Sequence, residues 1–184
     1  MNNNIKNKVM LDIEQIYKHG DCKYAIWNYV PNKFWVKSFN DWFPEKYSYN
    51  ETDFNYSVCF TMYLNLSPIN ASFYSNEFDA YLKEKGYADL LLTHISVIAP
   101  YSIINYLQYR LVDGEVKVFS SCLPFKPKHA KYGDKLKKHL QAKNITFLDD
   151  EILLIKTKGI SLELRKEDVR VYNCLFEDSD GWPK

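Results

Sequence analysis

An apolar stretch from Leu90 to Val112, LLLTHISVIAPYSIINYLQYRLV, most constrains the fold of this chain. It is long enough to cross a bilayer, which takes about 20 apolar residues. Pro100 stands in its middle, and a proline pushes the residue before it toward extended geometry. Polar side chains also interrupt the stretch, at Thr93, His94, Asn105, Gln108 and Arg110. We therefore expect strands over residues 89–98 and from residue 101 onward, and no membrane span.

The residues after Pro100 alternate with a period of two and run into Asp113-Gly114. Asp-Gly favours a two-residue hairpin turn, because both central positions of that turn need positive φ. Apolar pairs then share one face and charged pairs the other, so that register and hydrophobic pattern agree. The expected pairs are Val112 with Glu115, Leu111 with Val116, Arg110 with Lys117, and Tyr109 with Val118. The sequence thus predicts a hairpin over residues 101–123, at the centre of a sheet.

Three segments have the spacing of amphipathic helices. Residues 3–19 form the first and stop at Gly20, residues 75–87 have Ser75 as N-cap and end at Gly86, and residues 130–142 form the third. Further strands are expected at 23–30, around 34–39, and at 56–66, 145–148, 159–165 and 169–176, with a strand or a short helix at 149–157.

These elements predict an α+β fold. A single domain is expected over residues 1–176, followed by a polar C-terminal tail over residues 177–184. Its sheet is predicted to be mostly antiparallel, with about five to seven strands and with the three helices packed on a face or an edge. The chain has 15 Tyr, 11 Phe and 4 Trp, which supply the buried surface that disordered chains lack.

Charge and cysteine usage narrow the classes of partner and compartment. The net charge is +1, so no global field favours nucleic acid. Arginine, the preferred reader of phosphates and bases, occurs only three times. The N-terminus has no apolar core of signal-peptide length, and the four cysteines form no close pair. We therefore predict a cytoplasmic protein with reduced thiols, which binds neither nucleic acid nor membrane.

Candidate chemistry is sparse. His19 and Cys22 have a tolerable ligand spacing, but no second pair completes a structural zinc site. His94 could meet Cys59 or Cys122 in space, since all three lie on predicted strands, although cysteine is commonly a small core residue. No nucleophile elbow, phosphate loop or dinucleotide fingerprint is present. We therefore expect no catalytic residue, no metal and no cofactor.

Binding surfaces are the better candidates for function. The stretch from Lys126 to Lys143 holds seven lysines and could meet nucleic acid or an acidic protein, although a solvated helix face is the favoured interpretation. Trp and Tyr dominate binding hot spots, and short acidic clusters beside them suit a protein partner. The predicted partner-binding residues are Trp42, Asp149, Asp150, Glu151, Glu177, Asp178, Asp180 and Trp182.

The segments THISVIAPYSIINYLQYRLVDGE (93–115) and VRVYNCLFEDSDGW (169–182) resemble small bacterial proteins of the toxin-immunity type. That resemblance implies a non-enzymatic, cytoplasmic α+β protein that binds and neutralises a cognate toxin. Two alternatives stay open. One is an enzyme or small-ligand binder with a site of scattered residues such as His94, Tyr109 and Asp150. The other is a structural subunit that forms homo-oligomers through an aromatic face.

Overall fold

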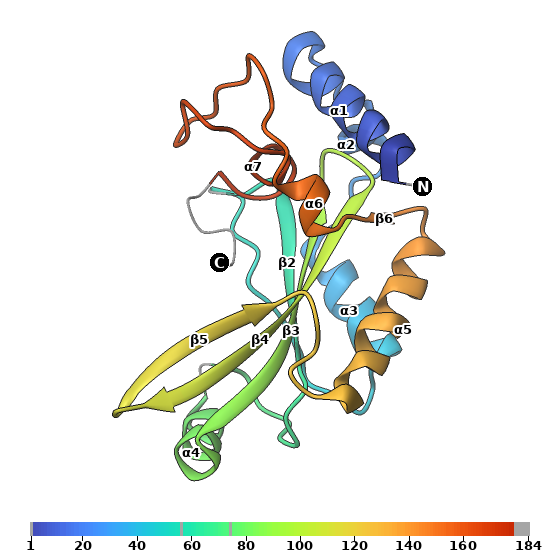
Figure 1. The fold of residues 1–184 in the computed structure, drawn as a ribbon. Helices are drawn as coiled ribbons and strands as arrows, with labels where there is room; N and C mark the ends of the chain where they lie inside the picture. Colours follow the sequence, from blue (N-terminus) through green and yellow to red (C-terminus); the bar gives the residue numbers. More distant parts are fainter. Residues whose placement is uncertain (1, 56, 74, 179–184) are drawn as a thin grey trace.

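A long antiparallel sheet runs through the molecule (Figure 1). The structure, a computed structural model, describes residues 2–55, 57–73 and 75–178. The strand order is β1-β2-β3-β4-β5, and β6 pairs in parallel with β4. The strands are β1 (Ser48–Asn50), β2 (Cys59–Asn65), β3 (Tyr87–Ser96), β4 (Tyr101–Val112), β5 (Glu115–Ser121) and β6 (Thr146–Phe147). The predicted α+β class and the predicted strand number are confirmed.

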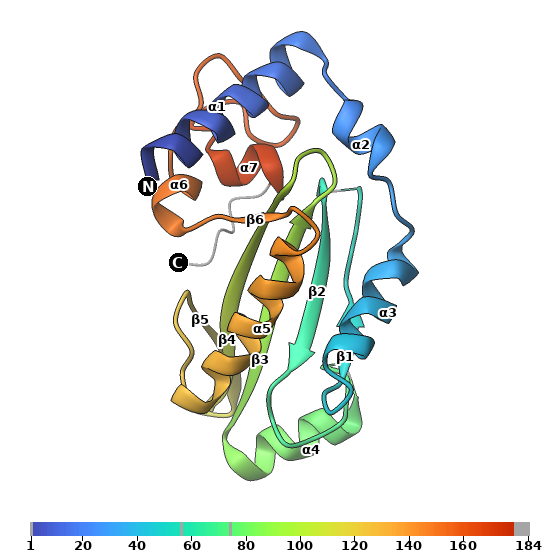
Figure 2. The ribbon, with the colours of Figure 1, turned by 90° about the vertical axis from the view of Figure 1, so that its right-hand side faces the viewer.

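Helices cover both faces of this sheet. They are α1 (Asn2–His19), α2 (Lys23–Trp27), α3 (Asn32–Trp42), α4 (Asn76–Lys85), α5 (Ala130–Gln141), α6 (Asp150–Leu153) and α7 (Val171–Leu175), with a 3-10 turn over Pro127–His129. Figure 2 shows α3 and α5 over one face, α4 at one end, and α1, α6 and α7 at the other end. No helix among the described residues combines the length and the apolar character needed to span a bilayer.

Alternation along the strands divides the core into layers. Leu91 and Ile95 of β3 point to the α3–α5 side and pack with Phe39 and Leu136. Leu90 and Leu92 point to the opposite side and pack with α4. Beyond them on that opposite side, α1, α6 and α7 close the other end of the sheet over Cys59, Tyr101 and Ile103.

Local sequence patterns correctly predict α1, α4, α5 and the β4–β5 hairpin. The Ser75 side chain accepts a hydrogen bond from the Phe78 amide and Gly86 adopts the left-handed conformation, as predicted. Asp113 and Gly114 both have positive φ, and all the predicted cross-strand pairs are present. The segment 149–157 contains the short helix α6 rather than a strand.

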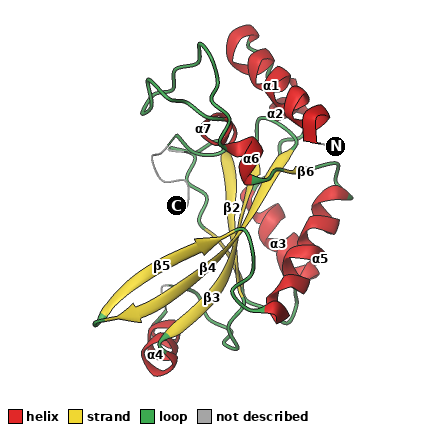
Figure 3. Cartoon of the chain, viewed as in Figure 1, coloured by secondary structure: helices red, strands yellow, loops and turns green. Residues whose placement is uncertain are grey.

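The central position of the hairpin was predicted wrongly, because β5 is the last strand of the sheet. Val116 and Val118 lie on the predicted apolar face, yet their exposed fractions are 52% and 53%. Most residues of β5 are exposed, and Figure 3 shows the β4–β5 hairpin extending away from α1, α3, α5, α6 and α7, with α4 alone near its end.

Four further strand predictions are wrong. Residues 159–165 form neither a strand nor a helix. Residues 23–30 and 34–39 contain α2 and α3, and residues 169–176 contain α7. Short apolar runs do not distinguish strand from helix by periodicity alone. In α3, the buried side chains of Trp35, Phe39 and the following Phe43 recur every four residues, which is helical spacing. Every residue of α7 is buried, so its sequence shows no polar face.

Replacing Gly114 with alanine should lower the free energy of unfolding by about 1 kcal/mol, because left-handed backbone strains a residue that has a β-carbon. No neighbouring atom would clash with the added methyl group, so the effect isolates backbone strain. Urea denaturation measures it. Asp113→Asn is the matched control and should be near neutral, since asparagine tolerates positive φ. Equal stability of the Gly114→Ala variant and the wild type would contradict the turn geometry.

Candidate functional site

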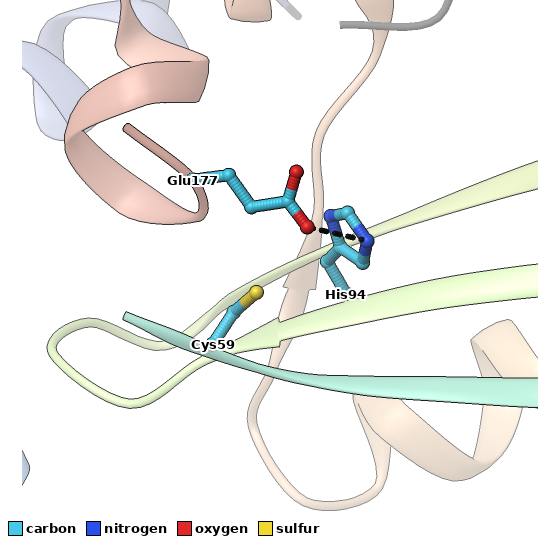
Figure 4. A group of neighbouring side chains, drawn as sticks. All are labelled: Cys59, His94 and Glu177. Carbon is cyan, nitrogen blue, oxygen red and sulfur yellow. Dashed lines mark ion pairs between the residues drawn. The ribbon is translucent and has the colours of Figure 1, made fainter. Parts of the chain in front are cut away.

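Three ligand-type side chains meet on the sheet face opposite α3 and α5 (Figure 4). Cys59 opens β2 and His94 lies near the end of β3, where Thr61 is its direct partner. Cys59 and His94 are therefore diagonal neighbours on one face of the sheet. Glu177 follows α7 and reaches them because its backbone pairs with Ser57, just before β2. Their ligand atoms lie within 4.8 Å of one another, the one such group in the described part of the chain.

Burial keeps the two strand residues uncharged. His94 is 3% exposed, and desolvation lowers its pKa although the nearby Glu177 carboxylate acts in the opposite direction. Burial, together with the Glu177 charge, raises the pKa of the Cys59 thiol to about 12. A reactive cysteine needs a lowered pKa and access to solvent, and Cys59 has neither. The Cys59–His94 pair is thus not arranged as a nucleophile and its base.

A hydrogen bond from Tyr172 orients the carboxylate group of Glu177. The Tyr172 hydroxyl donates to Glu177 Oε2 at 2.8 Å, while Glu177 Oε1 lies 3.4 Å from His94 Nε2. That second separation exceeds the usual range for an N–H···O hydrogen bond. His94 Nδ1 is buried, and it has no hydrogen-bond partner among the described residues. The cluster therefore contains a buried polar atom that the described protein atoms do not satisfy.

The outer sides of α3 and α5 form a second candidate site, which we call the α3–α5 basic surface. Trp42 stacks on His139 with ring centroids 4.6 Å apart and planes 4° from parallel. Lys143 lies over the rings of Phe34 and Trp42. The exposed lysines of this surface are Lys33, Lys37, Lys131, Lys135, Lys138 and Lys143. Burial and the charges of Lys135 and Lys143 lower the pKa of His139, so its ring stays neutral at neutral pH.

The predicted partner-binding residues do not converge on one surface. Trp42 is half-buried in the α3–α5 basic surface. The Asp149 carboxylate accepts from the Ile152 amide and so caps α6, which also contains Asp150 and Glu151. Glu177 lies beside His94, and Asp178 Oδ2 accepts from the Leu164 amide at 2.5 Å. Asp180 and Trp182 lie outside the described residues.

The other candidates are dispersed. Tyr109 packs on Phe73 and Phe78. It pairs with Ala88, which is six residues and roughly 20 Å along β3 from His94. Cys22 and Cys122 are exposed, and of the four cysteines only Cys59 belongs to the group with His94 in the described part of the chain.

An apolar cavity of about 350 Å³ opens between α2, α3, β2 and β3. Its lining includes Tyr24, Tyr29, Trp35 and Phe60, and Ile26 and Trp27 of the adjoining α2 are largely exposed. None of His94, Tyr109 and Asp150 lines it. This cavity therefore does not support the alternative of an enzyme or small-ligand binder whose site contains His94, Tyr109 and Asp150.

Sequence reasoning missed two contributors to these sites, namely the contact of Glu177 with His94 and the support from Tyr172. Both depend on the path of the chain after α7, for which no local sequence pattern is diagnostic.

The toxin-immunity resemblance stays a prediction. No family model matches this chain, and neither does any curated protein or solved structure.

Proposed function

We propose that this protein is a non-enzymatic binding protein, and that its α3–α5 basic surface docks an acidic protein. The observation that carries the proposal is the Trp42–His139 stack, which has Lys135 and Lys143 beside it and further exposed lysines on both helices. Tryptophan offers large contact area at little entropic cost, and a surrounding ring of one charge steers a partner of opposite charge.

The charge distribution supports an acidic partner. Residues 32–42 and 126–143 together hold nine lysines against two aspartates, while the whole chain carries a net charge of only +1. The rest of the chain is therefore net acidic, and the positive charge is concentrated around α3 and α5. Such a patch raises association rates for partners with a complementary surface.

A protein fits this surface better than a nucleic acid does. Neither α3 nor α5 contains arginine, the residue best suited to phosphates and bases. The aromatic rings of Trp42, Phe34 and Phe43 already lie against His139 or lysine side chains, so they present no row of free faces for base stacking. A toxin with an acidic face would be one such partner, as in the immunity-type interpretation.

Reversing two charges tests the proposal. The Lys135→Glu/Lys138→Glu variant should bind the partner roughly tenfold or more weakly than the wild type, because it opposes the complementary field. Lys117→Glu/Lys158→Glu makes the same change of charge away from the α3–α5 basic surface, and should bind within about twofold of the wild type.

Affinity capture from an extract of the native host, with the wild type and the two double variants as bait, identifies candidate partners. Titration of a purified candidate partner then measures how much each double variant weakens binding. A supporting partner is an acidic protein whose affinity falls with added salt and with the Lys135/Lys138 reversal. Equal binding to all three proteins, capture of nucleic acid alone, or capture of no protein would each refute the proposal.

A further inference from the structure

We infer that Cys59, His94 and Glu177 form a zinc-binding site. This inference is independent of the proposed docking function, because the cluster lies on the sheet face opposite α3 and α5. Zinc takes cysteine sulfur, histidine nitrogen and carboxylate oxygen as ligands. Three protein ligands are the number typical of zinc sites that leave one position open to an exogenous ligand.

The distances between the ligand atoms of Cys59, His94 and Glu177 suit a shared metal ion better than direct contact between the side chains. A tetrahedral zinc places neighbouring ligand atoms about 3.3–3.6 Å apart. His94 Nε2 and Glu177 Oε1 already have such a spacing, at 3.4 Å. All three ligand atoms lie within 4.8 Å of one another, so zinc would need to draw any pair together by about 1.5 Å at most.

The surroundings meet a further requirement of a metal site. Tyr172 donates to Glu177 Oε2 and leaves Oε1 toward His94, which is how outer hydrogen bonds orient a ligating carboxylate. Val58 and Asp178, the neighbours of Cys59 and Glu177 in the sequence, line a cavity of about 220 Å³.

Charge balance also favours the metal-bound state. A thiolate, a neutral imidazole and a carboxylate together offset the charge of a divalent ion, which makes burial of the whole group far less costly than burial of any single charge.

Metal binding to the purified protein tests the inference. The background should carry Cys22→Ser and Cys122→Ser, which removes both exposed thiols and leaves Cys59 and the buried Cys174. We expect one equivalent of Zn²⁺ by elemental analysis, and Co²⁺ substitution with a thiolate-to-cobalt charge-transfer band. Affinity should rise about tenfold per pH unit near neutrality, because binding displaces the proton of Cys59.

Variants then assign the ligands. Glu177→Gln keeps an acceptor for Tyr172 and should weaken Zn²⁺ binding at least about 100-fold, and Cys59→Ala should abolish the charge-transfer band. Zn²⁺ at about 100 times its dissociation constant should raise the melting temperature of the background protein by about 5–10 °C, and that of Glu177→Gln by far less. The inference is overturned if the background protein binds no Zn²⁺ or Co²⁺, or if both variants bind as tightly as it does.

Discussion

Replacing Gly133 with alanine is expected to destabilise the protein by about 2 kcal/mol, although alanine is the better helix former. Gly133 lies within α5, where a β-carbon would overlap the hydroxyl group of Tyr106 from β4. Tyr106 is only 6% exposed, so its ring cannot move aside without disturbing the core between the sheet and α5. Overpacking therefore outweighs the gain in helix propensity, which is about 1 kcal/mol.

Removing the obstructing hydroxyl tests the cause. In a Tyr106→Phe background the same Gly133→Ala substitution should be near neutral, because the overlapping oxygen is gone. A double-mutant cycle by urea denaturation measures the coupling between the two positions. If Gly133→Ala costs the same in both backgrounds, close packing against Tyr106 is not the reason for glycine here.

Replacing Lys126 with methionine should cost about 3 kcal/mol, because it leaves a buried carboxylate without its cation. Lys126 Nζ lies 2.7 Å from Asp89 Oδ2, and the Asp89 side chain is 3% exposed. Gln108 donates to the other carboxylate oxygen, while His129 Nδ1 is 3.9 Å away and neutral because burial lowers its pKa. Neither group replaces the lost charge.

The pH dependence of this effect identifies the unpaired charge. The Lys126 charge is one of the causes that lower the pKa of His129, so without Lys126 His129 should take up a proton in the folded state at a higher pH than in the wild type. The variant's native state then binds more protons than the wild-type native state, so its deficit in stability should shrink as the pH falls and grow as it rises. Lys128→Met, an exposed neighbour, is the control and should be near neutral at every pH. A deficit independent of pH would show that lost packing on Tyr87 dominates instead.

Elements with strong local signals could be predicted from the sequence. A positive-φ dipeptide and matching alternation define the β4–β5 register, and an N-cap serine with a left-handed glycine defines α4. Both signals lie within a few residues of the structure they specify. The same logic failed for α2 and α7, each of five residues, because helices that short owe their form to tertiary contacts more than to propensity.

The candidate sites were less predictable, because they depend on contacts between distant segments. His94 and Cys59 each lie on a predicted strand, but only the pairing of β2 with β3 makes them diagonal neighbours. Glu177 looked like part of an acidic tail, and its contact with His94 depends on the bridge to Ser57. Trp42 and the basic stretch from Lys126 to Lys143 are candidates on sequence alone, but their meeting on one surface depends on the helix α3, which the sequence pattern does not predict.

The open edge of β5 has a consequence for solubility at high concentration. Within the described chain β5 pairs only with β4, so its outer backbone groups could template another strand. Lys117 lies between Val116 and Val118 on this edge and is exposed. A second copy that added symmetrically about this position would bring two ammonium groups face to face. The lysine therefore acts as a gatekeeper against edge-to-edge aggregation.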